Sequence, residues 1–80
     1  MGPRLRRLSS RELLRGLVGF EVVATRGSHA KLRRVAASGE RQTLTIPLRP
    51  ELSAGTLRAI FRQASRFAAE SELRPLFFAD

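Results

Sequence analysis

The sequence predicts an α+β fold in which helices pack on one face of a three-stranded antiparallel sheet, in the order α-β-β-β-α. Three observations support this class. Apolar residues recur at helical spacing near both ends of the chain. Between these two stretches, three segments alternate apolar and polar residues as half-buried strands do. Short turns separate the three segments, and consecutive strands joined by short turns pair antiparallel.

The first helix is predicted to begin after Ser9. Ser9 has the character of an N-cap, and Glu12 three residues later completes a capping box. Leu8 and Leu13 have the spacing of a hydrophobic staple around this start. The apolar stripe of the helix consists of Leu13, Leu14, Leu17 and Val18. Gly19 is the predicted C-cap.

The segments FEVVAT and RQTLTIP are predicted to be the first and third strands. The core face of the first carries Phe20, Val22 and Ala24, and that of the third carries Leu44 and Ile46. Because each strand has one apolar face, the helices are expected to cover only one side of the sheet.

The segment HAKLRRVA, which comes after a break at Gly27 and Ser28, is predicted to be the second strand. Ala30 and Leu32 alternate with charged or polar neighbours and are expected to face the core. The opposite face carries His29, Lys31 and Arg33. This alternation places the only histidine of the chain on an open, basic face of the sheet.

The second helix is predicted to begin after Ser53 and to carry two stripes. Its core face consists of Leu57, Ile60, Phe61 and Ala64. A separate basic stripe consists of Arg58, Arg62 and Arg66. We expect a single domain over residues 1–80, with a basic N-terminal arm at residues 1–8 and a C-terminal tail at residues 68–80. Pro75 leaves the limits of a short helix in this tail open.

The charge of the chain points to a polyanionic partner. Its net charge is +8, from 15 Lys and Arg against 7 Asp and Glu. Residues 1–34 hold nine of the bases and two of the acids, so they carry +7 of this charge. All the bases except Lys31 are arginines, whose planar fork suits phosphate. A nucleic acid is therefore favoured over a merely solvated basic surface, and a membrane surface is disfavoured because no long apolar face accompanies the bases.

Several kinds of site are disfavoured by composition. The chain has no cysteine and one histidine, so we expect no metal site and no cofactor. It has no apolar run of membrane-spanning length, and its start, MGPRLRRLSS, lacks the apolar core of a signal peptide. We therefore expect a cytoplasmic protein.

The predicted order of elements is also that of double-stranded RNA-binding domains, so a dsRNA-binding-domain-like fold is expected, although topology alone does not establish function. The segments GF, RGSH, TLTIP and LSAGTLRAIFRQA, in this order and spacing, resemble the HicA toxins of bacterial toxin-antitoxin pairs. The resemblance runs from about Ser9 to Phe67, and its most specific pieces are the GSH motif and the GTLR block with the RQA that comes after it.

This resemblance implies an mRNA interferase, an endoribonuclease with mRNA as substrate, held inactive by a HicB-type antitoxin. It implies that the oligomer forms only through the antitoxin complex, and that the histidine of the GSH motif, here His29, is catalytic. Many relatives also place one or two histidines just after the third strand, where this chain has Leu48 and Arg49. The C-terminal tail departs from the short acidic helix of many relatives.

The residues around His29 suit RNA cleavage without a metal. The 2′-hydroxyl of RNA can attack the neighbouring phosphate if a base takes its proton, and an unperturbed imidazole, with a pKa of about 6.5, suits that task. Cations then stabilise the charged phosphorane. The candidate RNA-binding residues are Arg26, Gly27, Ser28, Lys31 and Arg33. The leading hypothesis is a metal-independent endoribonuclease with His29 as catalytic residue.

Two other hypotheses fit the same charge and topology. One is a non-catalytic double-stranded RNA-binding module, which has no need for His29. The other is an inert domain whose basic face exists only to meet an acidic antitoxin. In both, His29 is an ordinary exposed strand residue. Arg58 and Arg62 are left open between contacts with RNA and a solvated helix surface.

Overall fold

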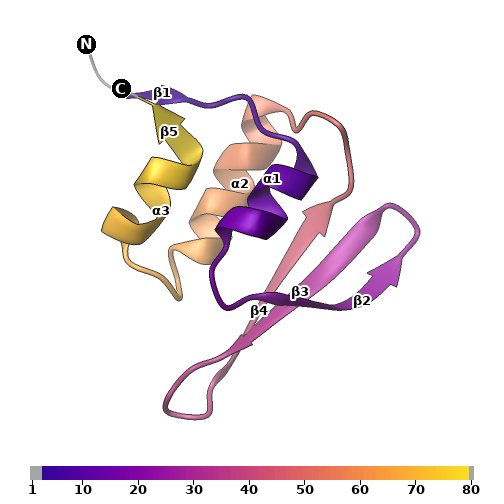
Figure 1. The fold of residues 1–80 in the computed structure, drawn as a ribbon, viewed down its shortest axis with the longest axis vertical. Helices are drawn as coiled ribbons and strands as arrows, with labels where there is room; N and C mark the ends of the chain where they lie inside the picture. Colours follow the sequence, from indigo (N-terminus) through magenta and orange to yellow (C-terminus); the bar gives the residue numbers. More distant parts are fainter. Residues whose placement is uncertain (1–2, 80) are drawn as a thin grey trace.

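The structure, a computed structural model, describes residues 3–79 and has the predicted α-β-β-β-α core (Figure 1). In chain order the elements are β1 (Arg4–Leu5), α1 (Ser10–Gly16), β2 (Glu21–Arg26), β3 (His29–Val35), β4 (Arg41–Pro47), α2 (Ala54–Ala64), α3 (Glu70–Phe77) and β5 (Phe78–Ala79). Strands β2, β3 and β4 form an antiparallel sheet in that order, with β3 in the centre. The helices lie together on one side of this sheet, so the predicted fold class is confirmed.

The predicted start of α1 is confirmed, and its predicted end is wrong. The backbone N–H of Glu12 donates to Ser9 Oγ at 3.1 Å, and Glu12 Oε1 accepts from the Ser9 N–H at 2.9 Å. The Ser9 backbone bond, then the Ser9 side chain and the charge of Arg6, lower the pKa of Glu12 below its ordinary value. The helix ends at Gly16, with Leu17 as C-cap, rather than at Gly19.

The early end of α1 alters the path of residues 17–19. Leu17 turns into the core and its carbonyl accepts a hydrogen bond from the Phe20 N–H at 3.2 Å. Val18, predicted to belong to the apolar stripe, therefore lies beyond the helix and is 71 % exposed. Gly19 has φ +84°, a backbone conformation that favours glycine, and it belongs to the turn into β2 rather than to a helix cap.

A β-bulge in β2 overturns part of the predicted strand pattern. Val22 pairs with Leu32, but Ala24 pairs with Lys31, so Val23 is an extra residue between the two pairs. Directly paired residues share a face of a sheet, and the bulge therefore moves Ala24 to the face away from the helices. Val22 stays on the helix side but is 48 % exposed, because the short α1 does not cover this edge strand.

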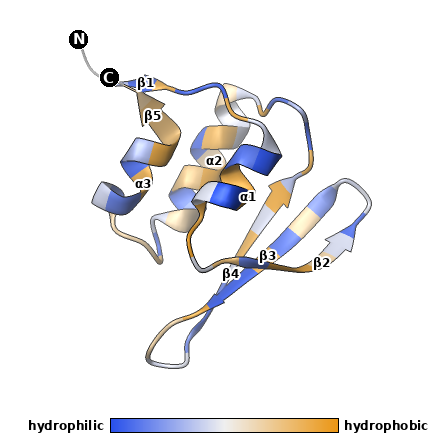
Figure 2. Cartoon of the chain, viewed as in Figure 1, coloured by the Kyte–Doolittle hydropathy of each residue, from blue (hydrophilic) through white to orange (hydrophobic). Residues whose placement is uncertain are grey.

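The hydrophobic core lies between the helices and the covered face of β3 and β4. Its buried residues are Leu8, Leu13, Leu17, Ala30, Leu32, Leu44, Ile46, Leu52, Leu57, Ile60, Ala64, Ala68, Leu73 and Phe77. This set confirms the predicted core positions of β3 and β4 and three of the four predicted in α2. The fourth, Phe61, is half-buried and meets the rings of Phe77 and Phe78 edge-on at 5.3 and 5.4 Å between centroids. Figure 2 shows the apolar residues of the helices gathered toward the centre of the molecule.

The two ends of the chain are joined by a second, small sheet. Arg4 pairs with Ala79 and Leu5 with Phe78, and the Arg6 N–H donates to the Phe77 carbonyl at 2.8 Å. Residues 4–6 of the segment expected to be a basic arm are therefore held against the C-terminal segment (Figure 1). The tail itself contains α3, with Pro75 inside it, and contributes Leu73 and Phe77 to the core.

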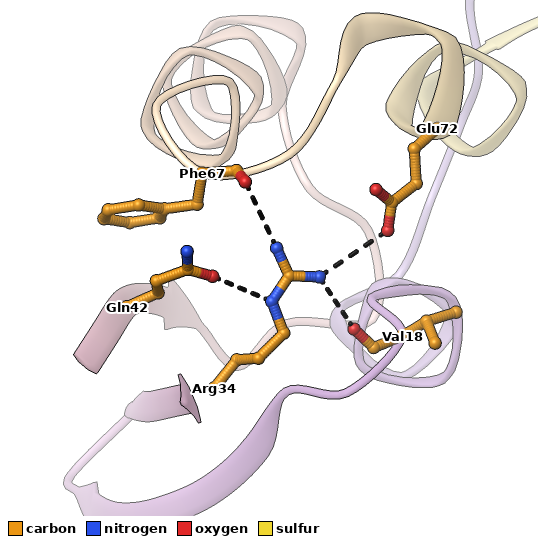
Figure 3. A network of polar contacts seen from close by, with 5 residues as sticks. All are labelled: Val18, Arg34, Gln42, Phe67 and Glu72. Atoms are coloured by element: carbon orange, nitrogen blue, oxygen red, sulfur yellow. Dashed lines mark hydrogen bonds and ion pairs between the residues drawn. The ribbon is translucent and has the colours of Figure 1, made fainter. Parts of the chain in front are cut away.

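One arginine on the covered side of β3 fastens the sheet to the helical layer (Figure 3). Arg34 Nε donates to Gln42 Oε1 at 2.8 Å, and its two terminal nitrogens donate to the carbonyls of Val18 at 3.2 Å and Phe67 at 3.3 Å. Its Nη1 also lies 3.6 Å from Glu72 Oε1 in α3. The guanidinium therefore joins β4, the turn after α1, the segment between α2 and α3, and α3 itself.

Replacing this arginine is expected to destabilise the domain strongly. Arg34→Met keeps an apolar stem but removes the fork, leaving the Val18 and Phe67 carbonyls without their partner. We expect the free energy of unfolding, measured by urea denaturation, to fall by about 2–4 kcal/mol. The matched control is Arg66→Met, just beyond α2, where the side chain is exposed, with an expected change of about 0.5 kcal/mol or less. Equal losses in the two variants would contradict this role of Arg34.

Candidate functional site

The face of the sheet away from the helices, called here the outward face, is organised in rows across the strands. His29 of β3 lies between Arg26 of β2 and Pro47 of β4. Lys31 lies in the next row, between Ala24 and Thr45. In both rows the central residue is exposed, and β3 thus presents its imidazole and its ammonium group side by side to solvent.

The row beyond Lys31 has a different character. Arg33 lies between Glu21 and Thr43 and is half-buried. Its Nε is buried and has no hydrogen-bond partner among residues 3–79. Arg33 therefore adds positive charge to the outward face, but it stands one row farther from His29 than Lys31 does.

The hairpin between β2 and β3 positions His29 at the end of the sheet. Arg26 and His29 are paired, and Gly27 and Ser28 form the turn between them. Gly27 has φ +57°, the left-handed region that favours glycine, and a Cβ there would meet no other atom within 4 Å. The glycine is therefore required by backbone conformation rather than by lack of space, and it leaves the surface beside His29 open.

The end of β4 closes this site from the other side. The Leu48 N–H donates to the Ser28 carbonyl at 2.6 Å, which ties the chain after β4 to the hairpin turn. Leu48 itself is half-buried and packs against the core. Arg49 is held through its backbone, since its N–H donates to Ser10 Oγ at 3.0 Å and its carbonyl accepts from the Ser10 hydroxyl at 3.1 Å. No imidazole is thus supplied here, and His29 is the only one in the sequence.

A depression of about 600 Å³, called here the hollow, lies beside His29. It is lined by Ala24, Thr25, Arg26, His29, Ala30, Lys31 and Thr45. Three predicted site residues, Arg26, His29 and Lys31, therefore meet at one recess. Gly27 and Ser28 lie in the adjoining turn, and Arg33 is not part of the lining.

Sequence reasoning missed four residues of the hollow, namely Ala24, Thr25, Ala30 and Thr45. Thr45 could have been found, because the alternation of its strand directs it outward opposite Lys31. Ala24 could not, because only the bulge at Val23 brings it to the outward face. The bulge arises from the pairing of β2 with β3, and the segment EVVATR carries no glycine that would mark it.

The arginine stripe of α2 lies apart from this site. Arg58, Arg62 and Arg66 are all exposed, and the last two line a separate depression of about 610 Å³ that also includes Glu70. A polar link between this helix and the site is provided by the Thr45 N–H, which lies 3.5 Å from Gln63 Oε1. The stripe is therefore a second basic surface on the helical layer.

Two further properties of the described chain bear on its class. Residues 3–79 contain no cluster of three or more His, Cys, Asp or Glu side chains that could share a metal ion. Among these residues, none of the helices has the length and apolar character needed to cross a bilayer.

Comparison with known proteins identifies the family. A sequence model of the HicA toxin of bacterial toxin-antitoxin pairs matches residues 11–65, which is more than half of the chain. The match includes the hairpin with its Gly27, Ser28 and His29, the whole three-stranded sheet and α2. No curated protein and no solved structure matches the chain. The chain belongs to the HicA family, the toxin components of bacterial toxin-antitoxin pairs.

Proposed function

We propose that this toxin is an endoribonuclease that cleaves mRNA at the outward face of its sheet, with His29 as the catalytic base. The observation that carries the proposal is the position of the single imidazole. It is exposed at the rim of the hollow, between a guanidinium and an ammonium group, on the face that no helix covers. Membership of a toxin family supplies the biological setting in which such an activity is expected.

The proposed reaction uses a nucleophile that RNA itself carries. His29 takes the proton from a ribose 2′-hydroxyl, and the 2′-oxygen forms a bond to the adjacent phosphorus. Arg26 and Lys31, which flank His29 in the hollow, stabilise the charge that develops on the phosphorane oxygens. The bond from phosphorus to the 5′-oxygen then breaks, and that oxygen takes up a proton from the imidazolium or from water. The products are a 2′,3′-cyclic phosphate and a 5′-hydroxyl.

The remaining predicted residues have supporting roles in this proposal. Gly27 and Ser28 leave room for the RNA backbone beside the imidazole, and their N–H groups are available to phosphate oxygens. Arg33 binds a phosphate one row away, and the place of this residue on the outward face in line with His29 and Lys31 supports such a contact. Leu48 and Arg49 take no part in the proposed reaction.

The proposal also names the partner and the place of action. A HicB-type antitoxin is expected to neutralise the toxin by covering the basic outward face, in the cytoplasm where mRNA is available. The net charge of +8 supports an acidic partner surface. The oligomeric state is expected to be set by the antitoxin complex.

Removing the imidazole is expected to abolish cleavage without unfolding the protein. His29→Ala changes an exposed strand residue, so stability is expected to change by about 0.5 kcal/mol or less. The rate of RNA cleavage is expected to fall by about 100-fold to 10,000-fold, the usual contribution of a positioned general base. The measurement is cleavage of an end-labelled RNA by the two purified proteins with a metal chelator present.

The matched control for this experiment is Val35→Ala, which alters the same strand on the same face at its far end. Its cleavage rate is expected to equal that of the wild type. Equal cleavage by the wild type and His29→Ala would contradict the proposed role of His29. Binding of duplex RNA by both proteins, with cleavage by neither, would instead establish the non-catalytic RNA-binding module.

The salt dependence of RNA binding is expected to report the cations of the outward face. Each phosphate contact on a single strand contributes about 0.7 to the slope of log affinity against log salt concentration. The double variant Lys31→Ala with Arg33→Ala is therefore expected to flatten the slope by up to about 1.4. The control is Arg58→Ala with Arg62→Ala, which is expected to keep the wild-type slope. A flatter slope only in the α2 double variant would move the RNA surface to the helical layer.

A further inference from the structure

The hollow beside His29 exists because of the bulge in β2. In a regular strand Val23 would lie opposite Lys31 on the outward face. Ala24 would then share the face of Val22 and point toward the helices. The extra residue Val23 turns Ala24 outward instead. Lys31 therefore has a small side chain on each side, Ala24 on β2 and Thr45 on β4, and the space above them stays open.

The lining of the hollow suits a flat, partly apolar group. Ala24 and the methyl group of Thr45 provide apolar surface, and Arg26 provides a planar guanidinium. Nucleobases that are splayed out of a single strand stack on guanidinium planes as well as on aromatic rings. The lining contains no Phe, Tyr or Trp, and its one aromatic ring, the imidazole of His29, is assigned to cleavage, so Arg26 is the stacking surface that remains in this recess.

Thr45 adds a polar group that can contact the edge of a base. Its backbone N–H faces α2, where it lies 3.5 Å from Gln63 Oε1. Its side chain lies on the outward face in the row of Lys31 and lines the hollow. A hydroxyl both donates and accepts hydrogen bonds, so Thr45 and Lys31 together offer donors and an acceptor to the edge of a base.

We propose that the hollow holds the base of an unpaired nucleotide next to the cleaved phosphate, and that the substrate class is therefore single-stranded RNA. This inference rests on the proposed function, because the hollow adjoins the imidazole assigned to cleavage. A base within a duplex is stacked and paired, and it enters such a recess only after both interactions are broken. Ala24 is accordingly the residue that determines whether a base is admitted.

The test fills the hollow and measures binding rather than cleavage. Ala24→Leu adds a bulky side chain at an exposed strand position, and Val35→Leu is the control on the same face outside the hollow. The probes are a short RNA with 2′-O-methyl groups, which cannot be cleaved, and a duplex of the same sequence. We expect the wild type to prefer the single strand, and Ala24→Leu to lose about 10-fold in affinity for it, since stacking one base is worth about 1–3 kcal/mol.

A second set of probes identifies the base itself. Single abasic residues are placed at each position of the 2′-O-methyl RNA in turn. At one position the wild type and Val35→Leu are expected to lose affinity, whereas Ala24→Leu is expected to lose nothing further, because the two changes remove the same contact. Preference of the wild type for the duplex, or equal single-strand affinity of the wild type and Ala24→Leu, would overturn the inference.

These measurements separate the inference from the proposed function. If the wild type cleaves no RNA but shows the single-strand preference and the loss in Ala24→Leu, the proposed cleavage is wrong and the base-binding hollow stands. If the wild type cleaves RNA through His29 but Ala24→Leu binds and cleaves like the wild type, the cleavage stands and the base-binding hollow is wrong.

Discussion

The two-residue alternation of β3 is the constraint on which the rest of the molecule depends. This strand is paired on both sides, so its register is set by both neighbours. Ala30 and Leu32 enter the core, while His29 and Lys31 reach solvent. A slip of one residue would exchange the two faces, burying charged groups and exposing leucine. The core and the candidate site are therefore consequences of one register.

Because of this alternation, the two adjacent arginines of β3 lie on opposite faces of the sheet and have different roles. Arg34 faces the helices, where its contacts are internal: a glutamine, two carbonyls and a carboxylate (Figure 3). Arg33 faces outward, and its Nε finds no partner among residues 3–79. The first side chain stabilises the fold by joining four segments through its hydrogen bonds, of which those to Gln42 and Phe67 are partly buried. The second adds positive charge to the outward face.

Most of the architecture is predicted by patterns that extend over only a few neighbouring residues. Such patterns are the capping box at Ser9 and Glu12, the alternation of β3 and β4, and the apolar stripe of α2. The exposure of His29 is a consequence of the same alternation. The position of this residue is thus predictable from sequence, whereas its role remains a proposal.

The features that sequence reasoning missed arise from contacts between distant parts of the chain. The bulge at Val23 depends on how β2 pairs with β3, and it alone brings Ala24 into the hollow. The small sheet of β1 and β5 joins residues at opposite ends of the chain. The early end of α1 coincides with the close packing of Gly16 against Leu76, where a Cβ would collide with the leucine side chain. The bulge and the small sheet have no local signal in the sequence, whereas the glycine at position 16 is a local signal for the early end of α1.

In the proposed function, RNA binds on the outward face of the sheet and not on the helical layer. The most direct test is NMR titration of the protein with a 2′-O-methyl RNA that cannot be cleaved, monitored through the backbone amide signals. We expect the largest shifts at Ala24, Arg26, His29, Lys31 and Thr45. Shifts gathered instead at Arg58, Arg62 and Arg66, with the outward face unchanged, would show that RNA binds the helical layer.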